Sequence, residues 1–208
     1  MKGKFIVLDG CDFTGKSTQI QKIATHLRSK NIKHITTREP GGTQFGEQLR
    51  EIILETGKNL HPQTELMLFF AARNEHIHTK ITPMLNQGIS IICDRFLASS
   101  FVYQGILRGI PTKTILTLHK ALMKGIKPDI TFILDITPET ILERMEAVMF
   151  HGCNSYDSKT LHDIAKIRNG FLEFATKERC EIIDASKTHD EVSSSILQKI
   201  EIMFENYE

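Results

Sequence analysis

The sequence predicts an α/β fold in which a five-stranded parallel sheet carries helices on both faces. Short apolar segments alternate with amphipathic segments along the chain, as strands and crossover helices do in such sheets. Residues 89–93 are apolar at almost every position, which is typical of a strand covered on both faces. A glycine-rich loop follows the first apolar segment, where a ligand would bind. At 208 residues, the chain is expected to form a single domain, residues 1–208.

The individual elements follow from strand-like or helix-like apolar periodicity. Pro83 lies near the end of a long predicted helix and can kink it. Residues 146–160 break the helical period, which predicts a mobile loop. The predicted strands are residues 5–8, 34–37, 89–93, 129–135 and 181–184. The predicted helices are residues 19–30, 44–56, 63–85, 99–108 and 113–123, one starting at Pro138, residues 161–177 and a closing helix.

Composition is that of an ordinary globular protein, with 40% hydrophobic and 25% charged residues. The formal net charge of +1 offers no basic surplus for nucleic acid or a membrane surface, so neither partner is expected. The first strand begins almost at once and no apolar run could span a membrane, so the expected location is the cytoplasm. The cysteines make no C-x-x-C pair and are expected to be reduced thiols: Cys11, Cys93, Cys153 and Cys180.

The glycine-rich loop has the pattern Gly10-x-x-x-x-Gly15-Lys16-Ser17, between a strand and a helix as a phosphate-binding loop requires. Glycine can adopt positive φ, so successive N–H groups turn toward phosphate oxygens. Lys16 can reach the β and γ oxygens of a nucleotide, and the Ser17 hydroxyl can bind Mg²⁺. An ordinary glycine-rich turn is the alternative, but it would not need the flanking strand and helix. The predicted ATP-phosphate contacts are Gly10, Cys11, Asp12, Phe13, Thr14, Gly15, Lys16, Ser17 and Thr18.

Charged residues follow three of the predicted strands where each strand ends. Asp9 ends the first, Arg38-Glu39 the second and Asp94-Arg95 the third. Because ligands of parallel sheets lie beyond the carboxyl ends of the strands, we expect these side chains to share a site. Arg38 and Arg95 could each bind phosphate oxygens with two hydrogen bonds, and surface ion pairing is the alternative. Asp9 is expected to be a structural acceptor.

A GTP-dependent switch protein is not indicated. The sequence has no Asn/Thr-Lys-x-Asp segment for guanine, and no Asp-x-x-Gly segment follows the third strand. Instead, four ordered segments resemble those of the thymidylate kinase family, and the resemblance covers nearly the whole chain. They are the phosphate loop 10–18, residues 37–43 (Thr-Arg-Glu-Pro-Gly-Gly-Thr), residues 68–73 (Leu-Phe-Phe-Ala-Ala-Arg) and residues 94–105.

The resemblance implies a nucleoside monophosphate kinase that phosphorylates dTMP to dTDP, with ATP as co-substrate and Mg²⁺ as cofactor. It implies that Asp12 contacts the 3′-hydroxyl of the sugar, Arg38 the monophosphate, and Tyr103 the sugar where a 2′-hydroxyl would project. Catalysis is assigned to Lys16, Arg38 and Arg95. A homodimer is implied as well. The implied dTMP contacts are Asp12, Arg38, Phe69, Arg73, Arg95, Ser100, Tyr103 and Gln104, and the metal residues are Ser17, Asp94 through water, and Glu39.

Phe69 has two interpretations, because a phenylalanine on an apolar helix face usually belongs to the core. Arg73 follows four residues later, on the same helix face. A base stacked on Phe69 with its edge bound by Arg73 is therefore the preferred interpretation, and Phe70 is assigned to the core. His76 and His78 are two residues apart and cannot form a helical metal pair, so structural roles are expected.

Other functions remain open at this stage. Another nucleotide or nucleoside kinase could have a related pocket, and a degenerate module could bind ATP without turnover. The chain also departs from the family, which places a catalytic arginine in the phosphate loop or in a lid. Phe13 holds the loop position, and the lid, residues 144–160, has no arginine-rich run. Its remaining cations are Arg144, which by resemblance packs near the adenine, His151 and Lys159; Lys159 or Arg144 is expected to substitute in part.

Overall fold

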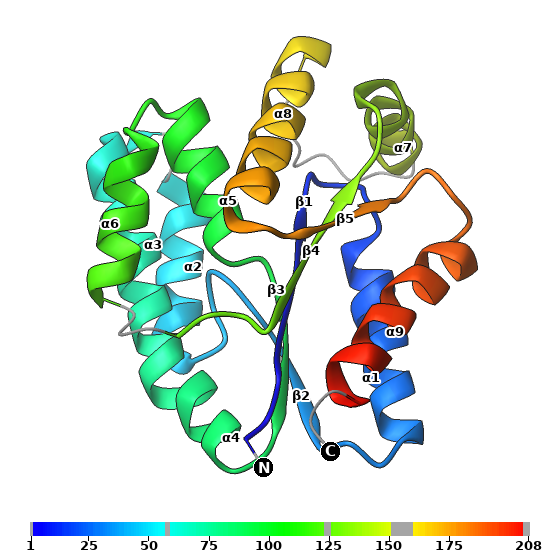
Figure 1. The fold of residues 1–208 in the computed structure, drawn as a ribbon. Helices are drawn as coiled ribbons and strands as arrows, with labels where there is room; N and C mark the ends of the chain where they lie inside the picture. Colours follow the sequence, from blue (N-terminus) through cyan, green and yellow to red (C-terminus); the bar gives the residue numbers. More distant parts are fainter. Residues whose placement is uncertain (1, 57–58, 123–125, 151–159, 206–208) are drawn as a thin grey trace.

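The computed structural model describes residues 2–56, 59–122, 126–150 and 160–205. Its centre is a five-stranded sheet, in the order β2-β3-β1-β4-β5, and every neighbouring pair of strands is parallel. The prediction of a parallel sheet with helices on both faces is confirmed (Figure 1). The strands are β1 (Phe5–Gly10), β2 (His34–Arg38), β3 (Ser90–Asp94), β4 (Ile130–Asp135) and β5 (Glu181–Asp184).

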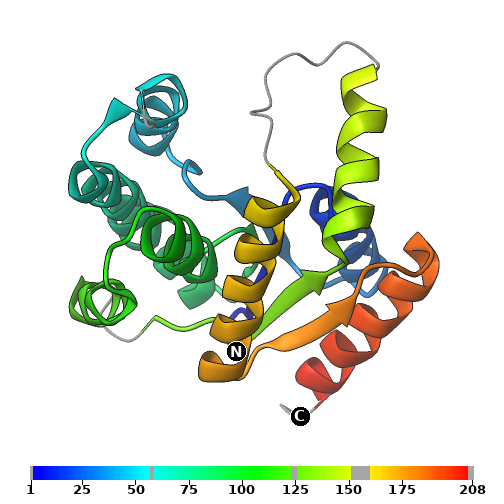
Figure 2. The same ribbon diagram turned by 90° about the horizontal axis from the view of Figure 1, so that it is seen from above.

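The helices form a layer on each side of the sheet, as the view from above shows (Figure 2). Helices α1 and α9 lie side by side on one face. Helix α8 lies on the other face, against the segment that follows α5. Helices α2 and α3 pack against each other beyond it. Their bounds are α1 Lys16–Ser29, α2 Gln44–Thr56, α3 Pro62–His76, α5 Leu97–Ser100, α8 Leu161–Glu178 and α9 His189–Glu205.

Strand β1 is buried at all six positions because β3 and β4 flank it and helices cover both its faces. This explains why its sequence is apolar without alternation. In register, Leu8 lies beside Asp94, and Asp94 lies beside Arg38. The strand ends that carry charged residues therefore meet at one edge, as predicted. Phe70 is buried, which confirms its assignment to the core, and Cys93 of β3 is buried as well.

Two of the predicted helices are interrupted by π-helical segments. The long helix is α3, then a π-helical turn, η2 (Ile77–Ile81), then α4 (Thr82–Asn86), so Pro83 falls in a first turn, which tolerates it. The next predicted helix is α5 continued by a π-helical segment, η3 (Phe101–Leu107). Helix α6 spans Thr112–Leu122.

The expected loop at 146–160 is wrong in its first part, because α7 (Pro138–Phe150) continues through residue 150. The sequence of this segment contains no helix-breaking Gly or Pro, so it can form a helix although it does not keep an amphipathic period. Residues 151–159 of the expected lid, including His151 and Lys159, lie outside the described residues. Within the described residues, no helix is long and apolar enough to cross a membrane.

Candidate active site

The phosphate loop joins the end of β1 to the start of α1. Gly10 and Gly15 have φ of 131° and 92°, and Phe13 between them has φ of 64°. A side chain at Gly10 would place Cβ 2.6 Å from the backbone oxygen of Leu134, so strand β4 leaves room only for glycine. Positive φ at these positions, followed at once by the start of α1 at Lys16, is the backbone geometry that can turn N–H groups toward an anion.

Lys16 is held over this loop. Its Nζ donates hydrogen bonds to the carbonyl oxygens of Cys11 at 2.6 Å and Gly10 at 3.2 Å. Burial lowers the pKa of Lys16 to about 8, and the charge of Arg95 acts in the same direction. Phosphate oxygens would compete with these carbonyls for the ammonium group. Lys16 is therefore positioned to exchange loop contacts for contacts with nucleotide phosphate.

Arg95 follows β3 and occupies a left-handed conformation with φ of 68°. Its Nη2 donates to Asp12 Oδ1 at 2.5 Å and its Nη1 to Ser99 Oγ at 2.8 Å. Its guanidinium lies 5.4 Å from the centre of the Tyr103 ring. Burial alone would lower the pKa of Arg95, but Tyr103 and the neighbouring carboxylates, first that of Asp12, raise it overall. Arg95 is thus a fixed cation beside the phosphate loop.

Asp9 supports this arrangement from below. It is fully buried and accepts hydrogen bonds from the backbone N–H groups of Phe96 and Ser99 and from the Ser99 hydroxyl. Its predicted role as a structural acceptor is confirmed. Arg95 is oriented by its hydrogen bonds to Asp12, Ser99 and the carbonyl oxygen of Gly10.

A cavity of about 300 Å³ opens beside Arg95. Its walls come from the loop after β2, helices α2 and α3 and the segment after β3. Six of the eight predicted dTMP residues line it, and Phe69, half-buried, is among them. The sequence therefore anticipated most of one continuous cavity. These six are Asp12, Phe69, Arg73, Arg95, Tyr103 and Gln104.

Arg73 is the most heavily fixed residue in this cavity. Its Nε donates to Glu39 Oε2 at 2.5 Å and its Nη2 to the carbonyl oxygen of Phe96 at 2.8 Å. The buried Nη1 has no hydrogen-bond partner among the described residues. Since a buried guanidinium N–H costs free energy when unpaired, Nη1 is the atom of this side chain suited to a ligand oxygen.

Glu39 and His76 hold Arg73 in place. Glu39 Oε1 lies 3.2 Å from His76 Nδ1, and His76 Nε2 lies 2.7 Å from Thr37 Oγ1. Burial favours a raised pKa for Glu39, but Arg73 and His76 lower it overall. A side chain at Gly42 would place Cβ 2.4 Å from His76 Nε2, so the glycine is sterically required. The expected structural role of His76 is confirmed. Both carboxylate oxygens of Glu39 are occupied by Arg73 and His76, which makes Glu39 poorly suited to bind a metal ion.

Gln104 and Ser100 differ in their relation to the cavity. Gln104 lines it, and its Nε2 donates to Glu65 Oε1 at 2.9 Å. Its Oε1 is buried without a partner among the described residues. The hydroxyl of Ser100 is equally buried and unpaired there, but Ser100 does not line the cavity. Gln104 is thus the better placed of the two for the edge of a base.

Arg38 is not brought into this cavity. It is exposed, and its Nη2 lies 2.7 Å from Glu47 Oε2, the surface ion pair that was its alternative interpretation. The hydrogen bond from Arg38 lowers the pKa of Glu47. Arg38 lines a neighbouring open cavity with Ser17 and Asp94. It is therefore close to the phosphate loop but separate from Arg95.

The residues at this open cavity fit a magnesium ion. Asp94 Oδ1 is buried without a partner among the described residues, and burial raises the pKa of the Asp94 carboxyl. The Ser17 hydroxyl lines the same cavity. Carboxylate and hydroxyl oxygens are hard ligands of the kind Mg²⁺ takes together with waters and phosphates. The described residues contain no cluster of three or more His, Cys, Asp or Glu side chains for a protein-only metal cage.

Arg50 is a cavity residue that sequence reasoning missed. It is half-buried on α2, and its Nη1 donates to the carbonyl oxygen of Pro40 at 3.0 Å. Burial lowers the pKa of Arg50, and the charge of Arg38 adds to this. Glu47, Arg50 and Leu54 lie three and four residues apart, on one face of α2. Because two of these residues are charged, the sequence pattern predicts that this face is exposed to solvent. Only the position of the Pro40 loop shows that this face borders a cavity.

Arg144 is anchored between the phosphate loop and the segment that follows β5. Its Nη1 donates to the carbonyl oxygen of Phe13 at 3.1 Å and its Nη2 to that of Ala185 at 3.2 Å. It therefore flanks the phosphate loop beside the segment that follows β5.

A phosphate loop at the head of a parallel sheet, with a second cavity lined by arginines beside it, defines a P-loop kinase for small phosphorylated acceptors. The family model "Thymidylate kinase" matches residues 8–196. The thymidylate kinase of Caldicellulosiruptor saccharolyticus is 39% identical over 202 residues, covering 97% of each chain. That of Ruthia magnifica is 41% identical over 199 residues, covering 94% of this chain and 96% of its own. The chain belongs to the thymidylate kinase family, whose members phosphorylate dTMP to dTDP.

Proposed function

We propose that the γ-phosphoryl group of ATP passes to the phosphate of dTMP between the phosphate loop and the cavity beside Arg95. ATP phosphates would bind the loop N–H groups and Lys16, and Arg144 would lie beside the adenine. The acceptor phosphate would lie near Arg95. The observation that supports this most is a fixed guanidinium, Arg95, between Asp12 of the loop and Tyr103 of the cavity.

The acceptor cavity suits a pyrimidine deoxynucleotide. The Phe69 ring would stack on the base, and the unpaired Nη1 of Arg73 would donate to a base carbonyl. The unpaired Oε1 of Gln104 would accept from a base N–H group. Tyr103 would lie against the sugar, and Asp12 would accept from its hydroxyl. A base with a carbonyl and an N–H group on one edge would satisfy both buried groups.

Transfer would need no covalent enzyme intermediate. In phosphoryl transfer the protein mainly positions the groups in line and stabilises the charge on the oxygens. Lys16 would neutralise charge on the donor side and Arg95 on the acceptor side, and Arg38 would reach in after leaving Glu47. Mg²⁺, held by Ser17 and through water by Asp94, would supply further neutralisation of phosphate charge when bound.

We also propose that the chain acts as one kinase domain, in the cytoplasm, as a homodimer. Met67 of α3 and Leu54 of α2 are 67% and 69% exposed, on helices that pack against each other. Apolar side chains this exposed favour a second copy of the chain as partner. Sedimentation of the wild type and of Met67→Glu would test this, since a charge at the interface should shift the dimer toward monomer.

The experiment that tests the reaction is a coupled assay of ADP release with dTMP, dUMP, thymidine, dCMP and dGMP as separate acceptors. We expect turnover with dTMP to exceed that with the others in kcat/KM. Preference for thymidine or another base would reassign the acceptor cavity. ATP binding without transfer to any of them would contradict a kinase function.

A further inference from the structure

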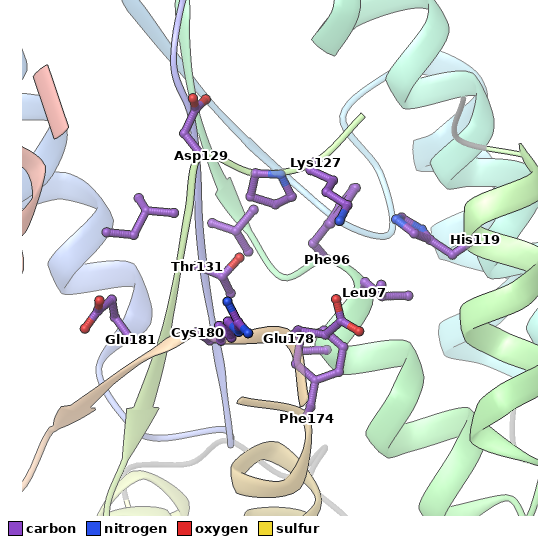
Figure 3. Close-up of a pocket in the computed structure, with 15 residues that line it drawn as sticks. Phe96, Leu97, His119, Lys127, Asp129, Thr131, Phe174, Glu178, Cys180 and Glu181 are labelled. Atoms are coloured by element: carbon purple, nitrogen blue, oxygen red, sulfur yellow. The ribbon is translucent and has the colours of Figure 1, made fainter. Parts of the chain in front are cut away.

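A separate cavity of about 320 Å³ lies at the other edge of the sheet, by the amino-terminal ends of β4 and β5. Its walls come from α6, the segment after β3, the turn before β4 and the end of α8 (Figure 3). None of its residues belongs to the phosphate loop. Its volume is at the lower end of the range for small-molecule sites, about 300–1,000 Å³.

The interior of this cavity suits a flat apolar body. Phe96 and Phe174 line it with the small or aliphatic side chains of Ala98 and Leu97. Phe96 is already edge-on to the His119 ring, with ring centres 5.5 Å apart. Aromatic rings prefer such edge-on and offset contacts, so one or two fused rings would fit against these walls.

His119 offers a polar contact inside the cavity. Its Nδ1 is buried and has no hydrogen-bond partner among the described residues. Burial lowers the pKa of His119 to about 4, with the charge of Arg73 acting in the same direction, so the ring is neutral near pH 7. A neutral imidazole can donate or accept at Nδ1 according to its tautomer. An unpaired buried atom of this kind points to a ligand group.

The charges at the cavity favour an anion. Two of its acids are neutralised, because Asp129 lies 3.5 Å from Lys4 and Glu181 lies 2.7 Å from Lys199. The other charged side chains that line it make no ion pair among the described residues, and they carry two positive charges and one negative. These are Lys127, Arg179 and Glu178.

Phe96 connects this cavity to the acceptor cavity, because it lines both. Its carbonyl oxygen accepts from Arg73 Nη2, and its ring centre is 5.0 Å from the Arg73 guanidinium carbon. A ligand that moved or fixed Phe96 would alter the position of Arg73. If occupancy of one cavity shifts Phe96, binding at the two cavities is coupled, and such a coupling is reciprocal.

We propose that this cavity is a second ligand site, for a small aromatic carboxylate, and that its occupancy changes the affinity for dTMP through Phe96. The ring system would pack on Phe96 and Phe174, a ring N–H group or ring acceptor would pair with His119 Nδ1, and the carboxylate would face Lys127. The existence of this second ligand site does not depend on the proposed kinase function. Only the predicted effect on dTMP affinity rests on that proposed function.

Binding is tested with indole-3-carboxylate as the probe, by ligand-observed NMR and calorimetry on the full chain. Indole lacks the carboxylate and cyclohexanecarboxylate lacks the aromatic ring, so these two compounds test the contribution of each group to binding. We expect Lys127→Gln to weaken binding about threefold and His119→Leu about tenfold. Lys120→Gln, next to His119 on α6 but outside the cavity, should leave binding unchanged. Each variant is first checked for an unchanged unfolding midpoint.

Absence of probe binding to the wild type at millimolar concentration would overturn the site. So would binding that none of the cavity variants weakens in folded protein. Indole binding as tightly as indole-3-carboxylate would overturn the assignment of a carboxylate.

Coupling is tested by measuring the dissociation constant of dTMP with and without saturating indole-3-carboxylate. We expect a change of at least threefold, with the same factor for probe binding with and without dTMP. A factor of one would overturn the coupling. Failure of dTMP to bind under either condition, with probe binding intact, would instead contradict the proposed acceptor.

Discussion

The acceptor side and the β2 side of the active site hold their arginines in opposite ways. Arg73 and Arg95 have side chains that are 2% and 19% exposed, and each makes hydrogen bonds to at least two groups. Arg38, at 54% exposure, is paired at the surface with Glu47. Buried, multiply bonded groups keep their geometry before substrate arrives, whereas an exposed pair is loosely held and screened by salt.

This difference indicates which part of the site is preorganised. Preorganised charge stabilises a transition state without rearrangement during the reaction. We therefore expect the acceptor side to determine both stability and recognition. Arg38 should contribute less, because it must first leave Glu47.

The largest contrast is expected between two glutamates. Glu39→Gln removes the charge that compensates buried Arg73, and breaking a buried pair costs about 3–5 kcal/mol of unfolding free energy. Glu47→Gln removes an exposed pair and should cost less than about 1 kcal/mol. Urea unfolding of both variants measures the two changes in unfolding free energy. Equal losses of stability would contradict the claim that the buried pair contributes more than the exposed pair.

The next contrast is between Arg95 and Arg38. Arg95→Ala should lower kcat for dTMP by about 10²–10³-fold, as loss of a preorganised charge-stabilising group does. Arg38→Ala should cost about tenfold, or about 1.4 kcal/mol. Steady-state kinetics of folded variants at saturating ATP measure both. A larger loss for Arg38→Ala would reverse the assignment of the preorganised cation.

Within the acceptor cavity, Phe69→Ala should raise KM for dTMP far more than KM for ATP. Base stacking on an aromatic ring is worth about 1–3 kcal/mol, which is roughly ten- to a hundredfold. Thr64→Ala, at an exposed position on the same helix, is the matched control and should leave both constants unchanged. A normal KM for dTMP in folded Phe69→Ala would return Phe69 to the core.

The smallest expected effect is in pH dependence. Because the pKa of Lys16 is lowered to about 8, its ammonium loses its proton as pH rises through that value in the free protein. Hence kcat/KM for ATP, which reports the free enzyme, should fall above about pH 8. Between about pH 8 and the ordinary lysine pKa of 10.5, Lys16 keeps its proton in the unfolded chain but loses it in the folded chain. The free energy of unfolding should therefore rise with pH across this window. Lys16→Arg should lose this limb, and an unchanged profile would exclude Lys16 as its origin.

Much of the fold could be predicted because its signals are local. The buried strands are apolar runs, and the phosphate loop is a contiguous pattern, so both are readable from neighbouring residues. Residues 146–150 were misjudged because a helix that lacks an amphipathic period can still form. The two π-helical segments were missed because they continue the helical pattern that surrounds them.

The site was predicted less completely because contacts between distant segments leave no local pattern. Arg50 borders the cavity only because the Pro40 loop passes beside it. The pairing of Glu39 with His76 joins residues 37 apart in the chain. Resemblance placed Arg73 correctly in the cavity, but the two bonds that fix it could be seen only in three dimensions.

The central claim is that the phosphate loop carries the transfer, and Lys16→Ala tests it most directly. The measurement is kcat for ADP release at saturating ATP and dTMP, with Lys22→Ala as control, an α1 lysine paired on the surface with Asp190. We predict that folded Lys16→Ala loses about 10²–10³-fold or more in kcat, while Lys22→Ala stays near wild type. Wild-type kcat in folded Lys16→Ala would contradict the account.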